Sequence, residues 1–183
     1  MKRDVVRLST YGRVLGTRKL GRELADLIRS RAAADDRPIV VDFKGVEVAS
    51  SPVLDEIALC LRAVIADYAD RFVIVANLND DVQETLELVL ESRDMSLAAL
   101  HDNTLELLGG RAHLEETLAE AQAMGTFTAA QLAEQLKVKL PNLYHRLNEL
   151  QAAGAIARTT SRGNVSRRAV QFAAANPREL TPT

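Results

Sequence analysis

Residues 127–156 read FTAAQLAEQL, KVK and LPNLYHRLNELQAAGAI, and this stretch decides the interpretation of the last third of the chain. Thr128 and Gln131 have the spacing of a capping box, in which each side chain satisfies a backbone donor at the start of a helix. Pro141 is tolerated in a first helical turn, because the N–H that proline lacks would have had no partner there. The stretch therefore predicts two short helices joined by a sharp turn at residues 137–139.

The second of these helices has one apolar and one polar face. Leu143, Leu147 and Leu150 recur at i, i+4 and i+7, which predicts that this side packs inward. Gly154 is expected to end the helix, since glycine readily adopts the left-handed conformation found there. The polar side carries Asn142, His145, Arg146 and Glu149.

A basic hairpin is predicted after the second helix. Residues 155–161 and 165–173 favour β-strands, and residues 162–164 form a plausible turn between them. Residues 125–183 hold 8 Lys and Arg against 3 Asp and Glu, a net charge of +5, whereas residues 1–124 hold 15 against 22, a net charge of −7. Nucleic acid responds to this local charge and not to the average over the chain. The arginines of the hairpin are Arg158, Arg162, Arg167 and Arg168.

Two helices followed by a hairpin make residues 111–175 similar to the winged-helix repressors of the MarR-like and ArsR-like type. The resemblance implies that double-stranded DNA is the partner and that Lys139, Asn142, His145 and Arg146 face the major groove. Asn142 would then pair with adenine and Arg146 with guanine or phosphate, while the hairpin arginines contact phosphate or the minor groove. The chain departs from the family at Lys137, where glycine is frequent, and at Lys139, where a capping Ser or Thr is usual.

The first part of the chain predicts an α/β fold. Residues 38–43 and 72–76 are continuous apolar runs of the kind found in strands buried on both faces. Helical patterns over residues 20–33, 51–66 and 80–92 alternate with these strands, which favours a central sheet with parallel strands and crossover helices. The segments on either side of Asp102 and Asn103 are expected to form a terminal hairpin.

Three segments carry a second resemblance: Thr17 with Arg18, VDFKGV at residues 41–46 and ASSPVLDE at residues 49–56. Through them residues 4–110 resemble the STAS-like family related to anti-sigma-factor antagonists, which implies a mixed sheet covered by helices. In such antagonists a kinase phosphorylates a serine at the place of Ser50 and Ser51, within Asp-Ser-Ser-Gly where this chain has Ala-Ser-Ser-Pro. The alternative is that one of these serines only caps the following helix.

Catalytic and metal sites are not predicted. Asp42, Asp55 and Glu56 could suggest acid–base chemistry, but carboxylates in a first helical turn also suit the helix dipole, and no nucleophile or third ligand accompanies them. The three histidines, His101, His113 and His145, lack the close spacing of a metal site. We therefore expect no enzyme, no metal and no cofactor.

The number of cysteines and the lack of long apolar runs predict the disulfide state and the location of the protein. A single cysteine, Cys60, excludes an intramolecular disulfide. The amino terminus lacks the apolar core of a signal peptide, and no apolar run reaches membrane-spanning length. We expect a soluble cytoplasmic protein with no membrane partner.

These observations predict three segments and two candidate functions. Residues 1–110 form the STAS-like α/β domain, residues 111–175 the winged helix-turn-helix domain and residues 176–183 a disordered tail. The favoured function is a bacterial-type DNA-binding transcriptional regulator, a homodimer whose STAS-like domain dimerises or receives a signal. The alternative is a partner-switching adaptor that does not bind DNA, in which a kinase or regulatory protein docks on the acidic domain. Residues 111–124 could serve as the first helix of the winged domain or pair with their copy in a second chain.

Overall fold

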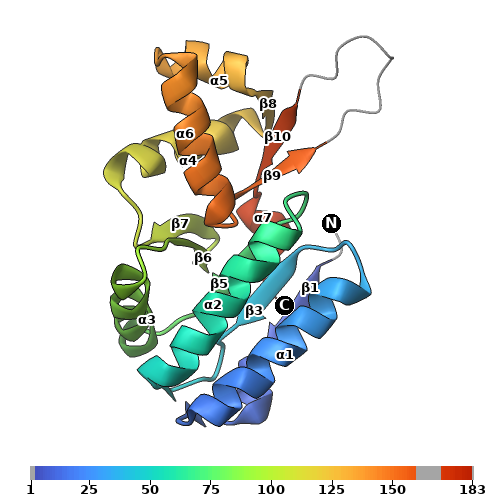
Figure 1. The fold of residues 1–183 in the computed structure, drawn as a ribbon, viewed down its shortest axis with the longest axis vertical. Helices are drawn as coiled ribbons and strands as arrows, with labels where there is room; N and C mark the ends of the chain where they lie inside the picture. Colours follow the sequence, from blue (N-terminus) through green and yellow to red (C-terminus); the bar gives the residue numbers. More distant parts are fainter. Residues whose placement is uncertain (1–2, 160–169, 183) are drawn as a thin grey trace.

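The computed structural model describes residues 3–159 and 170–182, and Figure 1 shows the arrangement of their helices and strands. Below, the N-terminal part means residues 3–110 and the C-terminal part means residues 111–182. A five-stranded sheet belongs to the N-terminal part and a three-stranded sheet to the C-terminal part. The predicted α/β fold class is confirmed.

The five-stranded sheet has the order β1-β3-β5-β6-β7. Its first four strands pair in parallel, and β7 closes the edge as the antiparallel partner of β6. Every residue of β3 and β5 is buried, as their continuous apolar sequence predicts. The bounds are β1 Asp4–Arg7, β3 Ile39–Asp42, β5 Val73–Ala76, β6 Leu97–His101 and β7 Thr104–Leu108.

Three helices of the N-terminal part pack on one face of this sheet: α1 (Arg18–Ala34), α2 (Ser51–Asp67) and α3 (Asp80–Ser92). Thr17 caps the first helix, because its side chain accepts a hydrogen bond from the Leu20 backbone N–H. A short 3₁₀ helix, η1 (Leu8–Tyr11), and a parallel ribbon of β2 (Val14–Leu15) with β4 (Val48–Ala49) complete the N-terminal part.

The C-terminal part contains the predicted pair of helices, α5 (Ala129–Leu136) and α6 (Leu140–Ala152). Both hydrogen bonds of the capping box at Thr128 are present, and Lys137 takes the left-handed conformation at the turn between the helices, with φ 54°. The three leucines of the predicted inner stripe of α6 are all 0% exposed. The local predictions for this helix pair are therefore confirmed.

Around the helix pair lie α4 (Ala112–Met124) and three antiparallel strands in the order β8-β10-β9. The strand bounds are β8 Thr126–Thr128, β9 Ile156–Thr159 and β10 Gln171–Ala174. Strand β8 was not predicted. The turn of the predicted hairpin lies in residues 160–169, outside the described residues.

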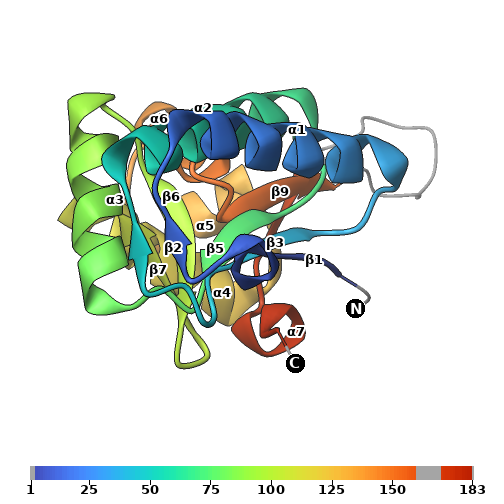
Figure 2. The ribbon, with the colours of Figure 1, turned by 90° about the horizontal axis from the view of Figure 1, so that it is seen from below.

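The C-terminal part covers the face of the large sheet that α1 and α2 leave open. Figure 2 shows α1 and α2 on one side of the sheet and α4 with α7 on the other. One cluster of buried residues joins Val40, Ile74 and Leu105 of the sheet to Leu118 of α4 and Phe127 of β8. The two parts therefore share a hydrophobic core.

The predicted disorder of the tail is wrong for residues 176–182. Residues Pro177–Leu180 form helix α7, and the Leu180 side chain is 0% exposed within the shared core. The Thr181 hydroxyl donates to Asn103 Oδ1 at 2.6 Å, at the tip of the β6–β7 hairpin. A single leucine and contacts with distant residues order this segment, and a local sequence pattern does not report such contacts.

The end of α6 lies directly against the N-terminal part. The Ala98 N–H of β6 donates to Ala153 O at 2.8 Å, and the Arg158 N–H of β9 donates to Ala69 O at 2.8 Å. Gly154, which ends the helix as predicted, has φ +79°, and a Cβ atom there would lie 2.1 Å from Val73 O. Only glycine suits this junction, because its conformation is left-handed and the neighbouring backbone leaves no space for a side chain.

Candidate functional site

The described residues that were predicted to face DNA lie on α6, just before it and on β9. Lys139, Asn142 and His145 are exposed, and so is Arg158 on β9. The remaining predicted residues, Arg162, Arg167 and Arg168, lie outside the described residues. The structure thus places an amide and an imidazole on the first half of α6 and a lysine directly before it.

Arg146 differs from these residues, because its guanidinium is bound within the protein. Its Nη1 donates to Thr117 Oγ1 on α4 at 3.1 Å. Thr117 is 0% exposed, and its hydroxyl donates in turn to His113 O at 2.7 Å. Arg146 therefore ties α6 to α4.

We predict that Arg146→Ala lowers the free energy of unfolding by about 1–2 kcal/mol, since it leaves the buried Thr117 hydroxyl without its donor. Asn142→Ala is the matched control on the same helix, and its exposed side chain should change stability by less than about 0.5 kcal/mol. Urea denaturation of the full chain measures both variants. Equal stability of the two would contradict a structural role for Arg146.

About one turn after Arg146 on α6, Glu149 also lies near α4. Its carboxylate lies 3.0 Å from His145 Nε2 and 4.0 Å from His113 Nε2. His145 remains 76% exposed in spite of this contact. The imidazole of His145 is thus oriented toward Glu149 along the helix, on the side of α6 that faces α4.

Two exposed residues of α6 were not singled out from the sequence. Leu140 is 39% exposed and Tyr144 is 47% exposed. Tyr144 lies outside the stripe of Leu143, Leu147 and Leu150, and that offset indicates its exposure. Leu140 continues the stripe three residues before Leu143, so the pattern does not report its exposure. Large apolar side chains are usually assigned to a core, so polar residues alone were considered for the outer face.

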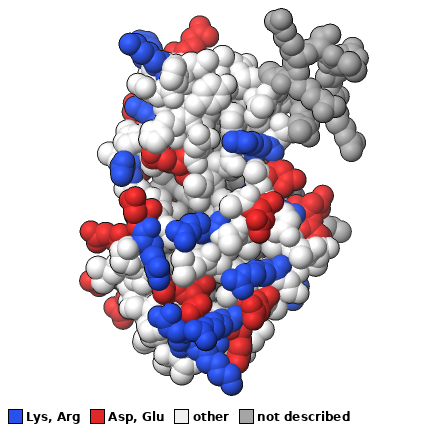
Figure 3. All heavy atoms as spheres, viewed as in Figure 1, with Lys and Arg blue, Asp and Glu red and all other residues white. Residues whose placement is uncertain are grey.

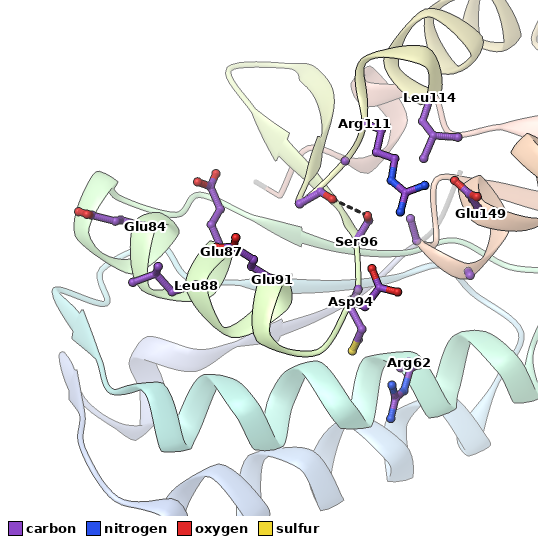
Figure 4. A pocket seen from close by; sticks show the side chains of 15 residues that line it. Arg62, Glu84, Glu87, Leu88, Glu91, Asp94, Ser96, Arg111, Leu114 and Glu149 are labelled. Carbon is purple, nitrogen blue, oxygen red and sulfur yellow. Dashed lines mark hydrogen bonds between the residues drawn. The ribbon is translucent and has the colours of Figure 1, made fainter.

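A cavity of about 660 Å³ lies where α3, the start of α4 and the end of α6 meet. Glu87, Leu88 and Glu91 line it from α3, while Arg111 and Glu149 line it from the C-terminal part. Figure 4 shows the Arg111 and Glu149 side chains near one another at one end of the cavity, away from the carboxylates of α3. The cavity is therefore lined by side chains from both parts of the protein.

The two serines at the start of α2 have different environments. Ser50 Oγ donates to Gly16 O at 3.0 Å and makes no capping bond to the helix, so the expectation of a capping serine is wrong for Ser50. Ser51 is exposed and lines a hollow of about 350 Å³ together with Arg18 and Arg93. Ser51 is thus the serine with an open hydroxyl near two cationic side chains.

The carboxylates considered for catalysis are bonded to protein donors. Asp42 is 0% exposed and accepts from Arg7 Nε at 3.1 Å and from Asn77 Nδ2 at 2.7 Å. Asp55 accepts two bonds of 2.9 Å from Arg93, and this hydrogen bonding raises the pKa of Arg93. Glu56, the third of these carboxylates, accepts from Arg18 Nη1 at 3.2 Å. All three carboxylates thus have arginine partners within the protein.

The thiol of Cys60 is buried. Burial raises the pKa of Cys60 to about 11, so the thiol is protonated near neutral pH. Within residues 3–159 and 170–182, no group of His, Cys, Asp or Glu is arranged to hold a metal ion.

Comparison of the chain with models of protein families, with curated proteins and with solved structures finds no match. In the part of the chain that the structure describes, none of the helices combines the length and apolar character needed to cross a membrane.

Proposed function

We propose that the protein is a DNA-binding transcriptional regulator, with a winged helix-turn-helix in its C-terminal part and a STAS-like domain in its N-terminal part. The observation that carries the proposal is the exposed first half of α6, which follows α5 after a sharp turn and precedes the β9–β10 pair. An α-helix fits the major groove of DNA, and an adjacent hairpin suits the backbone beside it.

The charge of the C-terminal part supports this proposal. Its described residues from 125 onward hold five basic side chains, Lys137, Lys139, Arg146, Arg158 and Arg178, against three acidic ones, Glu134, Glu149 and Glu179. Three further arginines belong to residues 160–169 of the sequence. On the face seen in Figure 3, acidic and basic side chains crowd together over the lower, N-terminal part and are sparser above it. The excess of positive charge thus belongs to residues 125–183, whereas residues 111–124 add one basic and three acidic side chains.

Signal input and dimerisation complete the proposed regulator. Glu149 is a residue of α6 and also lines the cavity between the two parts, so a ligand or protein there would contact the DNA-reading helix. A homodimer would present two copies of α6 to two half-sites about 34 Å apart. Cytoplasmic location belongs to the same proposal, since DNA is the partner.

The second candidate is a partner-switching adaptor, and the exposed Ser51 favours it. A phosphate on Ser51 would lie at the amino end of α2, in a hollow that Arg18 and Arg93 also line. The amino end of the helix attracts phosphate, while the two guanidinium groups already contact the Asp55 carboxylate in the same hollow. Under this alternative the C-terminal part binds protein and no DNA.

Fluorescence anisotropy with DNA from upstream of the protein's own gene separates the two candidates, with random DNA as control. A regulator should prefer the upstream DNA and lose affinity steeply as salt rises, because basic side chains displace counterions from phosphates. We predict that Lys139→Ala and Arg158→Ala each reduce the slope of log K against log salt by about one.

Lys19→Ala is the matched control for these variants, since Lys19 is 88% exposed on α1 in the N-terminal part. It should leave the salt slope unchanged. Absence of binding by the full chain at low salt would reject the regulator and favour the adaptor.

A further inference from the structure

The cavity where α3, α4 and α6 meet is lined by three kinds of side chain. Carboxylates line it from α3 and from Asp94 just after that helix, and guanidinium groups line it from α2 and α4. Leu88, Met95 and Leu114 add apolar surface. The cavity volume of about 660 Å³ is in the range of small-molecule sites in proteins. The lining therefore suits a ligand that is itself partly charged and partly apolar.

The carboxylates on the α3 side of the cavity have no cationic partner in the described part of the chain. Glu84, Glu87 and Glu91 recur at i, i+3 and i+7, so they share one side of the helix. Glu87 accepts a hydrogen bond from the neutral amide of Gln83. The side chains of Glu84, Glu91 and Asp94 form no hydrogen bond or ion pair with any described residue. This side of the cavity thus carries negative charge that no ion pair offsets.

Arg111 supplies a positive charge at the other end of the cavity, near Glu149 (Figure 4). The Glu149 carboxylate lies 3.0 Å from His145 Nε2, and Arg111 forms no ion pair with any described residue. The planar guanidinium group of arginine matches the two oxygens of a carboxylate. Arg111 is thus open to an acidic group of a ligand, while the α3 side is open to a basic one.

We propose that this cavity binds a basic amino acid, either free or at the carboxyl end of a short peptide. The carboxylate of the ligand contacts Arg111, its side-chain cation contacts Glu91 and Asp94, and its methylene stem lies on Leu88. Long basic side chains cover apolar surface in this way while their charged end remains among polar groups. The lining holds five carboxylates and two guanidinium groups, so a ligand with a net positive charge suits it.

A ligand in this cavity also touches the helix that is proposed to contact DNA, because Glu149 belongs to α6. The inference thereby names the class of ligand for the proposed signal input. Only this regulatory role rests on the proposed function, since binding of the amino acid involves no DNA. The test is therefore made on the protein alone.

Isothermal titration calorimetry of the full chain compares L-lysine with two analogues that each lack one group. Cadaverine is lysine without its carboxylate, and norleucine is lysine without its side-chain ammonium. Each missing group removes a hydrogen bond between charged partners, so we expect lysine to bind roughly tenfold more tightly than either analogue. Trilysine separates the two sources of the ligand. Tighter binding than lysine indicates a peptide, and equal or weaker binding indicates the free amino acid.

Two variants assign the contacts. Arg111→Gln should weaken lysine binding roughly tenfold and leave cadaverine binding unchanged, because only lysine has the carboxylate. Glu91→Gln should weaken both lysine and cadaverine and leave norleucine unchanged. Glu116→Gln is the matched control, because Glu116 is exposed on α4 and does not line the cavity. Thermal melting without ligand checks that these surface substitutions leave the fold intact.

Three results would overturn the inference. Absence of lysine binding would reject it, whatever the DNA titration shows. Equal binding of lysine and both analogues would indicate general attraction to an acidic surface and no built site. The same lysine affinity in Arg111→Gln as in wild type would reject the carboxylate contact. Lysine binding by a protein that binds no DNA would instead support the inference and reject the proposed regulator alone.

Discussion

Gly154→Ala is expected to lower the free energy of unfolding by about 2–5 kcal/mol, because two unfavourable effects coincide. The residue has φ +79°, a left-handed conformation that costs an L-residue with a side chain roughly 1–2 kcal/mol. The new Cβ would also lie 2.1 Å from Val73 O, a separation that forces the turn after α6 away from β5. Overpacking of this kind costs about 1–3 kcal/mol more. Urea denaturation of the full chain measures the loss.

Gly125→Ala is the matched control for this prediction. Gly125 has a similar φ of +71°, but a Cβ there would meet nothing within 4 Å. Its substitution should therefore show a conformational effect alone, of at least about 1–2 kcal/mol because its ψ of −78° lies outside the left-handed helical region. The difference between the two variants isolates the contact between the C-terminal part and β5, and equal losses would show that this contact contributes nothing.

Residues 1–110 expressed alone are expected to aggregate or to form a state without fixed packing. The face of the sheet that the C-terminal part covers carries Val40, Ile74, Leu100, Leu105 and Leu107, each at most 6% exposed in the full chain. Burial of such side chains contributes about 1.5–3 kcal/mol each, so their exposure removes roughly 10 kcal/mol. That amount equals the whole stability of a typical domain.

Size-exclusion chromatography, dye binding and thermal melting of the 1–110 fragment test this expectation. Coexpression with residues 111–183 serves as the control and should restore a soluble complex, since it returns the missing cover. A monomeric fragment with a sharp melting transition would instead show that the predicted STAS-like domain folds by itself.

A shared core also bears on how a signal could reach α6, the helix proposed to contact DNA. The end of α6 is bonded to β6 through Ala98 and Ala153, and Glu149 of α6 lines the cavity with residues of α3. Movement of α3 or β6 would therefore act on α6 without a flexible linker between them. We regard this direct contact as the structural basis for the signal input in the proposed regulator.

The sequence by itself determined the features that depend on residues a few positions apart. The capping box at Thr128, the leucine stripe of α6 and the buried strands β3 and β5 were all predicted and are confirmed. Helix caps and apolar periodicity act over one or two turns, so the local pattern reports them directly. The α/β class followed from the alternation of these elements.

Only the tertiary structure decided the features that join distant residues. Arg146 is bonded to Thr117, 29 positions away, and Ser50 is bonded to Gly16, 34 positions away. Leu180 orders a tail that a local pattern assigned to disorder, and Gly154 meets Val73 across the two parts. Helical periodicity shows that a polar residue lies outside the core, but it does not show which neighbouring element it meets. That choice rests on how the helices and the sheet pack, so the contact of Arg146 with α4 follows only from the tertiary structure.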